Sequence, residues 1–207
     1  GANQFNRGDW KSGYVRVYQY ESGSWAQLGD DIVGEAEGDG SGSSISLSSD
    51  GTTLAVGAFR NGIYTTGHVR VYRYSGSSWT QLGSDIDGQD DYDNFGYSVS
   101  ISSNGSILAI GAPALGGRES YLQAYQYISG SWIQLGNNID NEVGGDEYGV
   151  SVSLSSDGTI VAAGAPKNDG NYSGYAIYSG HARVHQYSNG SWTQLGSDID
   201  AEIGDGL

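Results

Sequence analysis

Apolar and polar positions follow one another in short stretches, and none of them has the 3.6-residue apolar period of a helix. In SVSIS (98–102) serine alternates with aliphatic residues, which predicts a strand with two unlike faces. An Asp-Gly or Asn-Gly turn comes next, and apolar runs such as TTLAVGA (52–58) predict a strand buried on both faces. VRVYRY (69–74) is rich in β-branched and aromatic residues, and WTQLGSDI (79–86) follows it after a short turn. The pattern therefore predicts all-β units of four strands.

This four-stranded unit recurs about every 53 residues. Its most regular part is a W-x-Q-L-G segment that begins at Trp25, Trp79, Trp132 and Trp192. Repeated four-stranded units packed around an axis are typical of the blades of a β-propeller. We therefore expect a single β-propeller repeat region over 1–207. It comprises a partial blade at 1–32, blades at about 42–87, 96–140 and 149–200, and at 201–207 the start of a connection to the next blade. The partial blade and the three blades are called the first to fourth repeats below.

The predicted blades do not complete a ring. The opening segment supplies only the outer half of a blade, so a closed four-bladed ring would lack two inner strands and leave open edges. We expect a fragment of a larger ring, or a piece of a longer repeat protein. Pairing of the two chain ends, or of the edges with another copy, is the alternative. The absence of methionine, even at position 1, agrees with a processed or excised piece.

Two short motifs flank the first two strands of the third repeat: Phe95-Gly96 and Gly111-Ala112-Pro113, within DNFGYSVSISSNGSILAIGAPALG (93–116). They resemble the FG-GAP repeat of integrin-α-like β-propellers, and the W-x-Q-L segment resembles the variety found in predicted extracellular proteins of microbes and algae. The resemblance covers essentially the whole chain, although Tyr148-Gly149 replaces Phe-Gly and Gly40-Ser41-Gly42 lacks the aromatic residue. It implies a β-propeller that is secreted or displayed at the cell surface.

The composition adds a strongly acidic charge. Nine lysine and arginine residues against 24 aspartate and glutamate residues give a formal net charge of −15. Such a field repels nucleic acid and anionic membranes, so we expect neither as a partner. The chain has no cysteine, which removes disulfides and thiolate metal sites, and no apolar run approaches the roughly 20 residues of a membrane-spanning helix.

The resemblance to FG-GAP repeats suggests calcium as a candidate cofactor. Integrin-type repeats bind it in an acidic hairpin between the first two strands of a blade, but here each such turn has at most one carboxylate, Asp50 or Asp157, and Asn104 in the third repeat. The family's calcium site is therefore not expected. A separate group of acids precedes the third repeat and has enough oxygen donors for a cation: Asp87, Asp90, Asp91 and Asp93. Its spacing fits no standard cation loop, so we favour solvated acidic surface and expect no cofactor.

The repeated tryptophans and three Asn-x-Ser sequences each have two interpretations. The tryptophans could stack on sugars, but we expect them to open outer strands and to pack between blades, with the indole N–H on a nearby carbonyl. The Asn-x-Ser sequences at Asn104, Asn171 and Asn189 lie on predicted turns, where a eukaryotic secreted protein is open to glycosylation. Asn-Gly-Ser is also ordinary hairpin chemistry.

Catalytic signals are sparse. His68 and His181 occupy equivalent positions at the start of a third strand, and His185 replaces a tyrosine of the sister repeats. No Gly-x-Ser-x-Gly segment opens a helix. We therefore interpret the histidines as strand residues and predict that the chain is not an enzyme.

Loops of variable length on a constant framework predict a binding face. They span 3–12, 59–66, 113–120 and 166–179. Their candidate contact residues are Arg7, Asp9, Trp10, Arg60, Arg118, Tyr172, Tyr175 and Tyr178. The first loop contains Arg7-Gly8-Asp9, a tripeptide that adhesion receptors bind, although propellers of the resembled family receive such tripeptides.

The leading expectation is a non-catalytic extracellular scaffold or adhesion module that binds a protein or glycan partner. A carbohydrate-binding propeller lectin is one alternative. A structural subunit of an extracellular fibre or wall, self-assembling through open blade edges, is the other.

Overall fold

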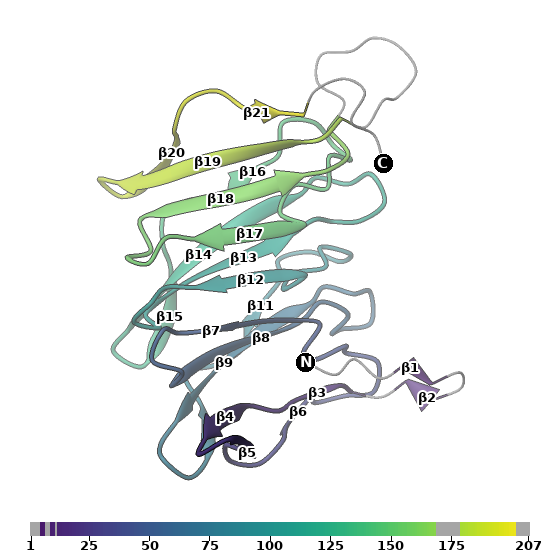
Figure 1. The fold of residues 1–207 in the computed structure, drawn as a ribbon. Coiled ribbons are helices and arrows are strands. Elements are labelled where there is room, and N and C mark those ends of the chain that lie inside the picture. Colours follow the sequence, from purple (N-terminus) through teal and green to yellow (C-terminus); the bar gives the residue numbers. More distant parts are fainter. Residues whose placement is uncertain (1–4, 7–8, 11, 169–178, 202–207) are drawn as a thin grey trace.

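A computed structural model describes residues 5–6, 9–10, 12–168 and 179–201. Every regular element among them is a β-strand, and the sheets are stacked one above another from the first repeat to the fourth (Figure 1). This confirms the all-β fold. None of the described residues forms a helix long and apolar enough to cross a membrane.

The second, third and fourth repeats each form one five-stranded sheet of the same topology. The second repeat contains β7 (Ser44–Leu47), β8 (Thr53–Ala58), β9 (His68–Tyr74), β10 (Trp79–Gln81) and β11 (Ile86–Asp87). The third contains β12 (Ser98–Ile101), β13 (Ile107–Ala112), β14 (Tyr121–Ile128), β15 (Ser131–Gln134) and β16 (Ile139–Asp140). The fourth contains β17 (Ser151–Leu154), β18 (Ile160–Ala165), β19 (His181–Ser188), β20 (Ser191–Gln194) and β21 (Ile199–Asp200). Neighbouring strands are antiparallel and follow chain order, as a meander.

The predicted fourth strand is divided in two. In the second repeat β10 pairs with the end of β9, whereas β11 pairs with its beginning at Val69 and His68. Between them Leu82 donates its backbone N–H to the carbonyl of Val71 over 2.7 Å, and Gly83 has a φ of 80°. The Leu-Gly pair of the W-x-Q-L-G segment therefore interrupts the strand.

The first repeat has outer strands only. These are β3 (Tyr14–Val15), β4 (Tyr18–Glu21), β5 (Ser24–Gln27) and β6 (Ile32–Val33), after a hairpin of β1 (Phe5–Asn6) and β2 (Asp9–Trp10). β3 pairs with β6 and β4 with β5. No closed propeller is found among the described strands, so the confirmed part of the fold is a propeller-like array of sheets.

Side-chain oxygens hold the turn between the first two strands of each complete repeat. Asp157 Oδ1 accepts hydrogen bonds from Ser155 Oγ, Thr159 N and Thr159 Oγ1 at 2.6–3.0 Å. Asn104 Oδ1 makes the same three bonds in the third repeat at 2.7–3.0 Å. The side-chain oxygens of Asp157 and Asn104 thus accept hydrogen bonds from the hydroxyl and N–H groups of their own turns.

Serines of the innermost strands connect one repeat to the next. Ser44 Oγ donates to the carbonyl of Gly96, and Ser98 Oγ donates to that of Gly149, each over 2.7 Å. Ser100 Oγ accepts from Leu154 N over 2.9 Å. The alternating serines thus satisfy backbone groups of the neighbouring sheet.

Glycine is needed where two of these sheets approach each other. A Cβ on Gly111 would lie 2.0 Å from the carbonyl oxygen of Gly149, a backbone atom that cannot yield. Gly57 has the same relation to Gly96 at 2.2 Å. The aromatic residue before each of these partner glycines, Phe95 or Tyr148, is completely buried between the sheets.

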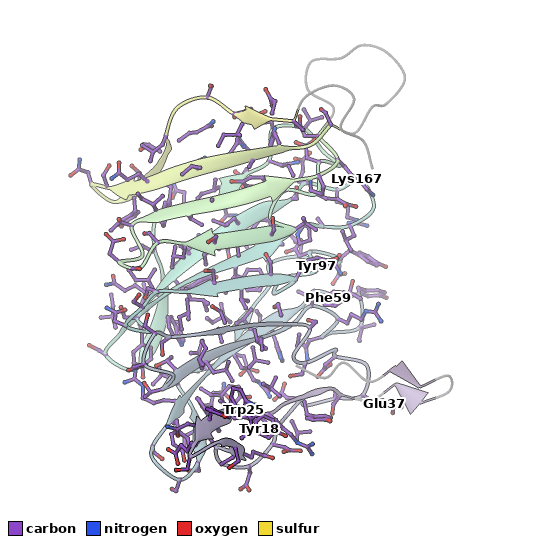
Figure 2. All side chains as sticks on the ribbon, in the orientation of Figure 1. Tyr18, Trp25, Glu37, Phe59, Tyr97 and Lys167 are labelled. Carbon is purple, nitrogen blue, oxygen red and sulfur yellow. The ribbon has the colours of Figure 1, made fainter. Side chains whose placement is uncertain are left out.

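Three of the four repeated tryptophans connect the sheets on their outer side, as predicted, and in the described part of the chain Trp25 does not. The indole Nε1 of Trp79 donates to the carbonyl of Leu28, that of Trp132 to Leu82 and that of Trp192 to Leu135, at 2.7–2.8 Å. Each ring also packs on a tyrosine of its own sheet, with centroids 5.2 Å apart. Trp25 is 68% exposed and lies with Tyr18 at the end of the stack (Figure 2).

Replacing Trp132 with phenylalanine should lower the free energy of unfolding by about 1–3 kcal/mol, because the carbonyl of Leu82 loses its donor in a half-buried position. Urea denaturation measures the change. Trp25→Phe is the matched control and should change stability by less than about 0.5 kcal/mol, because this ring is exposed. Equal losses in the two variants would refute the inter-sheet role.

Candidate functional site

Four polar positions recur at every junction between repeats. Two lie on the third strand, one precedes the last short strand, and one follows the last short strand of the preceding repeat. In the second repeat they are His68, Arg70, Asp85 and Glu35. In the third they are Tyr121, Gln123, Asn138 and Gln89, and in the fourth His181, Arg183, Asp198 and Glu142. The charged set is therefore present twice and a neutral set once.

In the second repeat these residues form a closed ion-pair network. Arg70 donates from Nε and Nη2 to the two carboxylate oxygens of Asp85 over 3.0 and 3.1 Å, and it also contacts Glu35. His68 Nδ1 lies 3.8 Å from Asp85 Oδ2, the oxygen that Arg70 Nη2 already occupies. Both carboxylates thus pair with the one guanidinium.

In the third repeat neutral hydrogen bonds replace the ion pairs. Gln123 Nε2 donates to Asn138 Oδ1 over 2.8 Å, and Asn138 Nδ2 donates to Gln89 Oε1 over 3.2 Å. Tyr121 Oη donates a hydrogen bond to Asp93 Oδ2 over 2.5 Å. The junction therefore folds without any of the four charged or imidazole groups.

In the fourth repeat the guanidinium is turned away from the aspartate. Arg183 Nη2 donates to the backbone carbonyl of Asp140 over 2.8 Å, and Nη1 lies 3.5 Å from Glu142 Oε1. Its Cζ lies 4.5 Å above the ring of Tyr148. Asp198 is held by Gln194 Nε2 at Oδ1 over 2.6 Å, and its Oδ2 faces His181 Nδ1 at 3.8 Å.

The four residues of the fourth-repeat set, together with Tyr148 and His185, are called the fourth-repeat cluster below. In the described part of the chain, all buried side-chain polar atoms without a hydrogen-bond partner belong to this cluster. They are Tyr148 Oη, His181 Nε2, Arg183 Nε and His185 Nδ1. Each of these residues is at most 7% exposed. Buried polar atoms are normally paired, so four unpaired polar atoms at one junction make this junction a candidate functional site.

The replacement of a tyrosine by His185 helps to explain the unpaired atoms. In the third repeat the equivalent Tyr125 Oη reaches Gln123 Oε1 over 2.7 Å. The shorter imidazole of His185 makes no such bond to Arg183 among the described residues. The Arg183 Nε–H is left without the acceptor that a hydroxyl at this position would offer.

Burial sets the protonation states of two members of the cluster. Desolvation, reinforced by Arg183, lowers the pKa of His185 to about 4, so the imidazole is neutral at pH 7. Desolvation raises the pKa of Tyr148 to about 12, and Asp198 and Glu142 add to the rise while Arg183 opposes it. Tyr148 is therefore a hydrogen-bond donor at neutral pH.

Two groups of side chains in the described residues could hold a metal ion: Glu35–His68–Asp85 and Glu142–His181–Asp198. They are the two charged sets described above. Sequence reasoning missed them because each histidine was considered as a strand residue by itself. Aligning the second, third and fourth repeats would have shown that histidine, arginine, aspartate and glutamate are exchanged together among these three.

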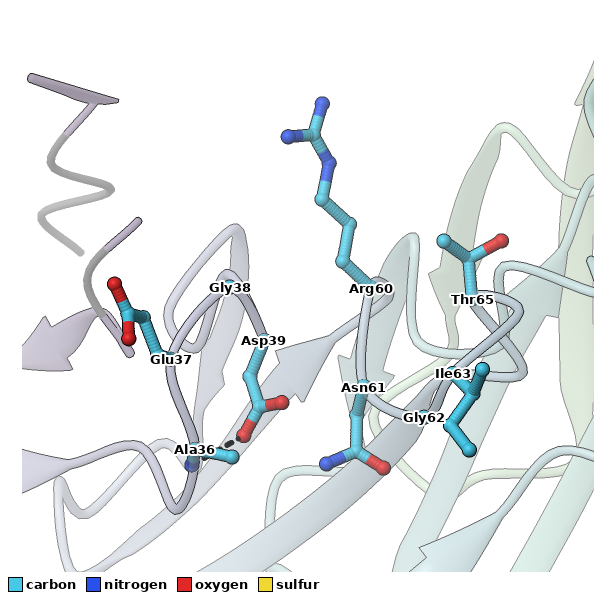
Figure 3. A pocket seen from close by; sticks show the side chains of 9 residues that line it. All are labelled: Ala36, Glu37, Gly38, Asp39, Arg60, Asn61, Gly62, Ile63 and Thr65. Carbon is cyan, nitrogen blue, oxygen red and sulfur yellow. Dashed lines mark hydrogen bonds between the residues drawn. The ribbon is translucent and has the colours of Figure 1, made fainter. Parts of the chain in front are cut away.

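The predicted contact residues Arg60 and Arg118 border hollows at equivalent places on the loop side of the stack. The hollow beside Arg60 has a volume of about 1090 Å³, with Glu37 on its opposite side and Asp39 bonded to the backbone of Ala36 (Figure 3). Arg118 borders the second hollow and lies with Cζ 4.5 Å above the ring of Tyr92.

The four aspartates named as cation donors have different surroundings. Asp93 is buried and accepts from the backbone of Gln89 and Asp90 and from Tyr121, so it is a structural residue of the loop. Asp90 and Asp91 line the hollow beside Arg118. Asp87 lies in β11 opposite His68. The aspartates do not form one of the described metal-competent groups.

The other predicted residues divide into described and undescribed positions. Asp9 and Trp10 form β2, paired with Asn6 and Phe5. Asn104 and Asn189 lie on exposed turns. Arg7, Asn171, Tyr172, Tyr175 and Tyr178 lie outside the described residues.

The chain matches no protein-family model and no curated protein. Its fold is similar to the crystal structure of a "putative 6-phosphogluconolactonase" from Bacteroides uniformis, with a TM-score of 0.60 and 15% identity over 92% of this chain and 52% of that one. It is also similar to a protein of the same description from Bacteroides fragilis, with a TM-score of 0.56 and 11% identity over 82% of this chain and 41% of that one. The chain thus spans about half the length of these proteins or less. At these identities the likeness shows a shared, β-propeller-like fold.

These matches correct two predictions, that of a non-catalytic scaffold and that of no enzyme activity. Both similar structures carry the name of an enzyme. The predictions depended on the absence of a nucleophile motif at the start of a helix. An array of sheets positions reactive side chains on strands and at junctions, so the missing helix does not exclude catalysis.

Replacing His185 with tyrosine should change how stability depends on pH. Because the pKa is about 4 in the folded protein and 6.5 ordinarily, the unfolded chain takes up the proton first. The contribution of neutral His185 is complete above pH 6.5 and is lost as the pH falls towards 4. We expect the variant to gain stability relative to the natural chain over this interval.

Urea unfolding at pH 7, 5.5 and 4 measures this difference. Histidine NMR titration provides an independent reading of the low pKa. A stability difference that is the same at all three pH values would contradict the buried neutral state of His185.

Proposed function

We propose that the chain is part of a β-propeller hydrolase that opens the ring of a lactone, with the fourth-repeat cluster as its reaction centre. The observation that carries this proposal is the set of four unpaired buried polar atoms around Arg183 and Asp198. The names of the two structures that share the fold support the reaction class.

The cluster has the two kinds of group that ester hydrolysis requires. Glu142, with its side chain 45% exposed, is placed to take a proton from an attacking water. Arg183 Nε and Tyr148 Oη are unpaired donors that can stabilise the negative charge on the carbonyl oxygen in the transition state. Water adds to the carbonyl carbon, the bond to the ring oxygen breaks, and that oxygen receives the proton.

The charge of the chain favours an uncharged lactone over a phosphorylated one. A net charge of −15 repels a phosphate dianion. Arg183 is the cation of the cluster, and Glu142 lies beside it. A sugar-acid lactone without phosphate avoids this repulsion and still provides ester and hydroxyl oxygens for the unpaired donors.

The same proposal places the complete repeats in a larger ring. The exposed ring of Trp25 supports a further sheet against the first repeat, because each equivalent tryptophan bonds to a neighbouring sheet. An FG-GAP-type framework and an extracellular location are compatible with this arrangement and stay predictions.

Lactone hydrolysis by the purified protein tests the function. A pH-stat assay with gluconolactone and with 6-phosphogluconolactone should give the larger kcat/KM for the uncharged substrate. Arg183→Gln, which copies Gln123 of the third repeat, should lower kcat/KM about 10²-fold through loss of the donor.

Arg16→Gln is the matched control. Arg16 pairs with Asp31 over 2.8 Å at the equivalent position of the first repeat, outside the proposed centre, so the activity should be unchanged. No hydrolysis of either lactone above the spontaneous rate, or equal activity of Arg183→Gln and the natural chain, would reject the proposal.

A further inference from the structure

The side chains of Glu142, His181 and Asp198 bring two carboxylates and one imidazole together at one junction. One ligand atom from each lies within 4.8 Å of the other two. We propose that they bind a divalent transition-metal ion such as Zn²⁺, whose usual ligands are imidazole nitrogens and carboxylate oxygens.

The separation between His181 and Asp198 suits a shared ion. Nδ1 and Oδ2 are 3.8 Å apart, too far for a hydrogen bond. Zinc binds such atoms at about 2.0–2.2 Å, so an ion between them fits a gap of this size. Glu142 lies on the solvent side of the pair, with its side chain 45% exposed, and leaves a route for the ion to enter.

His181 provides an observation independent of the acidic residues. Its side chain is 1% exposed, and its Nε2 has no hydrogen-bond partner in the described part of the chain. Its Nδ1 faces Asp198 without bonding to it. An unpaired nitrogen on a buried imidazole is costly, because burial removes the water that would satisfy it, so this histidine is not explained by packing alone.

In the second repeat an arginine occupies the equivalent donor set, Glu35–His68–Asp85. There Arg70 occupies both oxygens of Asp85 and also contacts Glu35, so the guanidinium takes the place of a cation. In the fourth repeat Arg183 bonds instead to the carbonyl of Asp140, and Asp198 has no arginine bond among the described residues. The open set is therefore Glu142–His181–Asp198.

Charge favours a cation at the open set. Arg183 lies near Glu142 and not at Asp198, so the Asp198 carboxylate has no arginine beside it in the described part of the chain, and the whole chain has a net charge of −15. The inference rests on the proposed function only for the role of the ion, which would supply a more acidic bound water beside Arg183; one Glu142 oxygen would bind the ion and the other would accept the proton. Binding itself can be measured without any lactone.

Titration of the chelator-treated chain with Zn²⁺, followed by calorimetry, tests the site. We expect one equivalent to bind, and Co²⁺ in its place to give visible d–d absorption. The triple variant Glu142→Gln, His181→Tyr, Asp198→Asn copies the neutral set of the third repeat, so it should fold and lose this equivalent.

The same three exchanges in the second repeat, Glu35→Gln, His68→Tyr and Asp85→Asn, are the matched control and should leave the equivalent in place. Circular dichroism confirms that each variant folds. No binding by the natural chain, or loss of the ion only in the second-repeat variant, would overturn the proposal.

The two proposals fail separately. A chain that binds Zn²⁺ at this site but hydrolyses no lactone rejects the proposed function alone. A chain that hydrolyses lactone at full rate after chelation, without binding Zn²⁺, rejects the metal site alone.

Discussion

The fold depends on the hydrogen bonds that connect one repeat to the next. Each sheet has two apolar faces, and the central β13 is almost wholly buried, so no repeat can cover its own surface. Tryptophan N–H groups reach a leucine carbonyl of the preceding sheet on the outer side, and serine hydroxyls reach a glycine carbonyl of the following sheet on the inner side. These bonds join the sheets on both sides, and at the glycine contacts the backbones are too close for a side chain to fit between them.

A fixed relation between sheets gives every junction the same set of neighbouring positions. The second residue after β6, β11 or β16 contacts one of the other polar positions in the following repeat. A charge introduced at one of these positions therefore requires an answering charge at another, whereas a neutral set needs none. The third repeat, with Gln89, Gln123 and Asn138, shows that the fold is satisfied without charge. The charged sets in the second and fourth repeats are thus not a general requirement of the junction.

The sequence predicted the strands, the repeat and the inter-sheet tryptophans, because each depends on a local pattern of period two or on a recurring phrase. It did not predict the interruption at Leu82, since the apolar pattern of WTQLGSDI is continuous while its backbone is not. It did not predict the cluster either, because Glu142 and Asp198 come from different repeats. In so acidic a chain a single acid or histidine does not indicate a catalytic site, and catalysis was therefore wrongly excluded. Only the joint exchange of these residues between repeats indicates that they form one site.

An aromatic residue explains why two identical charged sets adopt different arrangements. The position before the partner glycine is Ser41 ahead of the second repeat and Tyr148 ahead of the fourth. Because Ser41 offers Arg70 no ring to stack on, Arg70 instead makes two hydrogen bonds to the carboxylate of Asp85. Arg183 lies 4.5 Å above the Tyr148 ring, where the ring face attracts the guanidinium and the nearby carbonyl of Asp140 accepts its Nη2–H. The tyrosine that departs from the Phe-Gly motif thus holds the arginine away from Asp198, and this single aromatic contact converts a closed ion pair into an open group of donors.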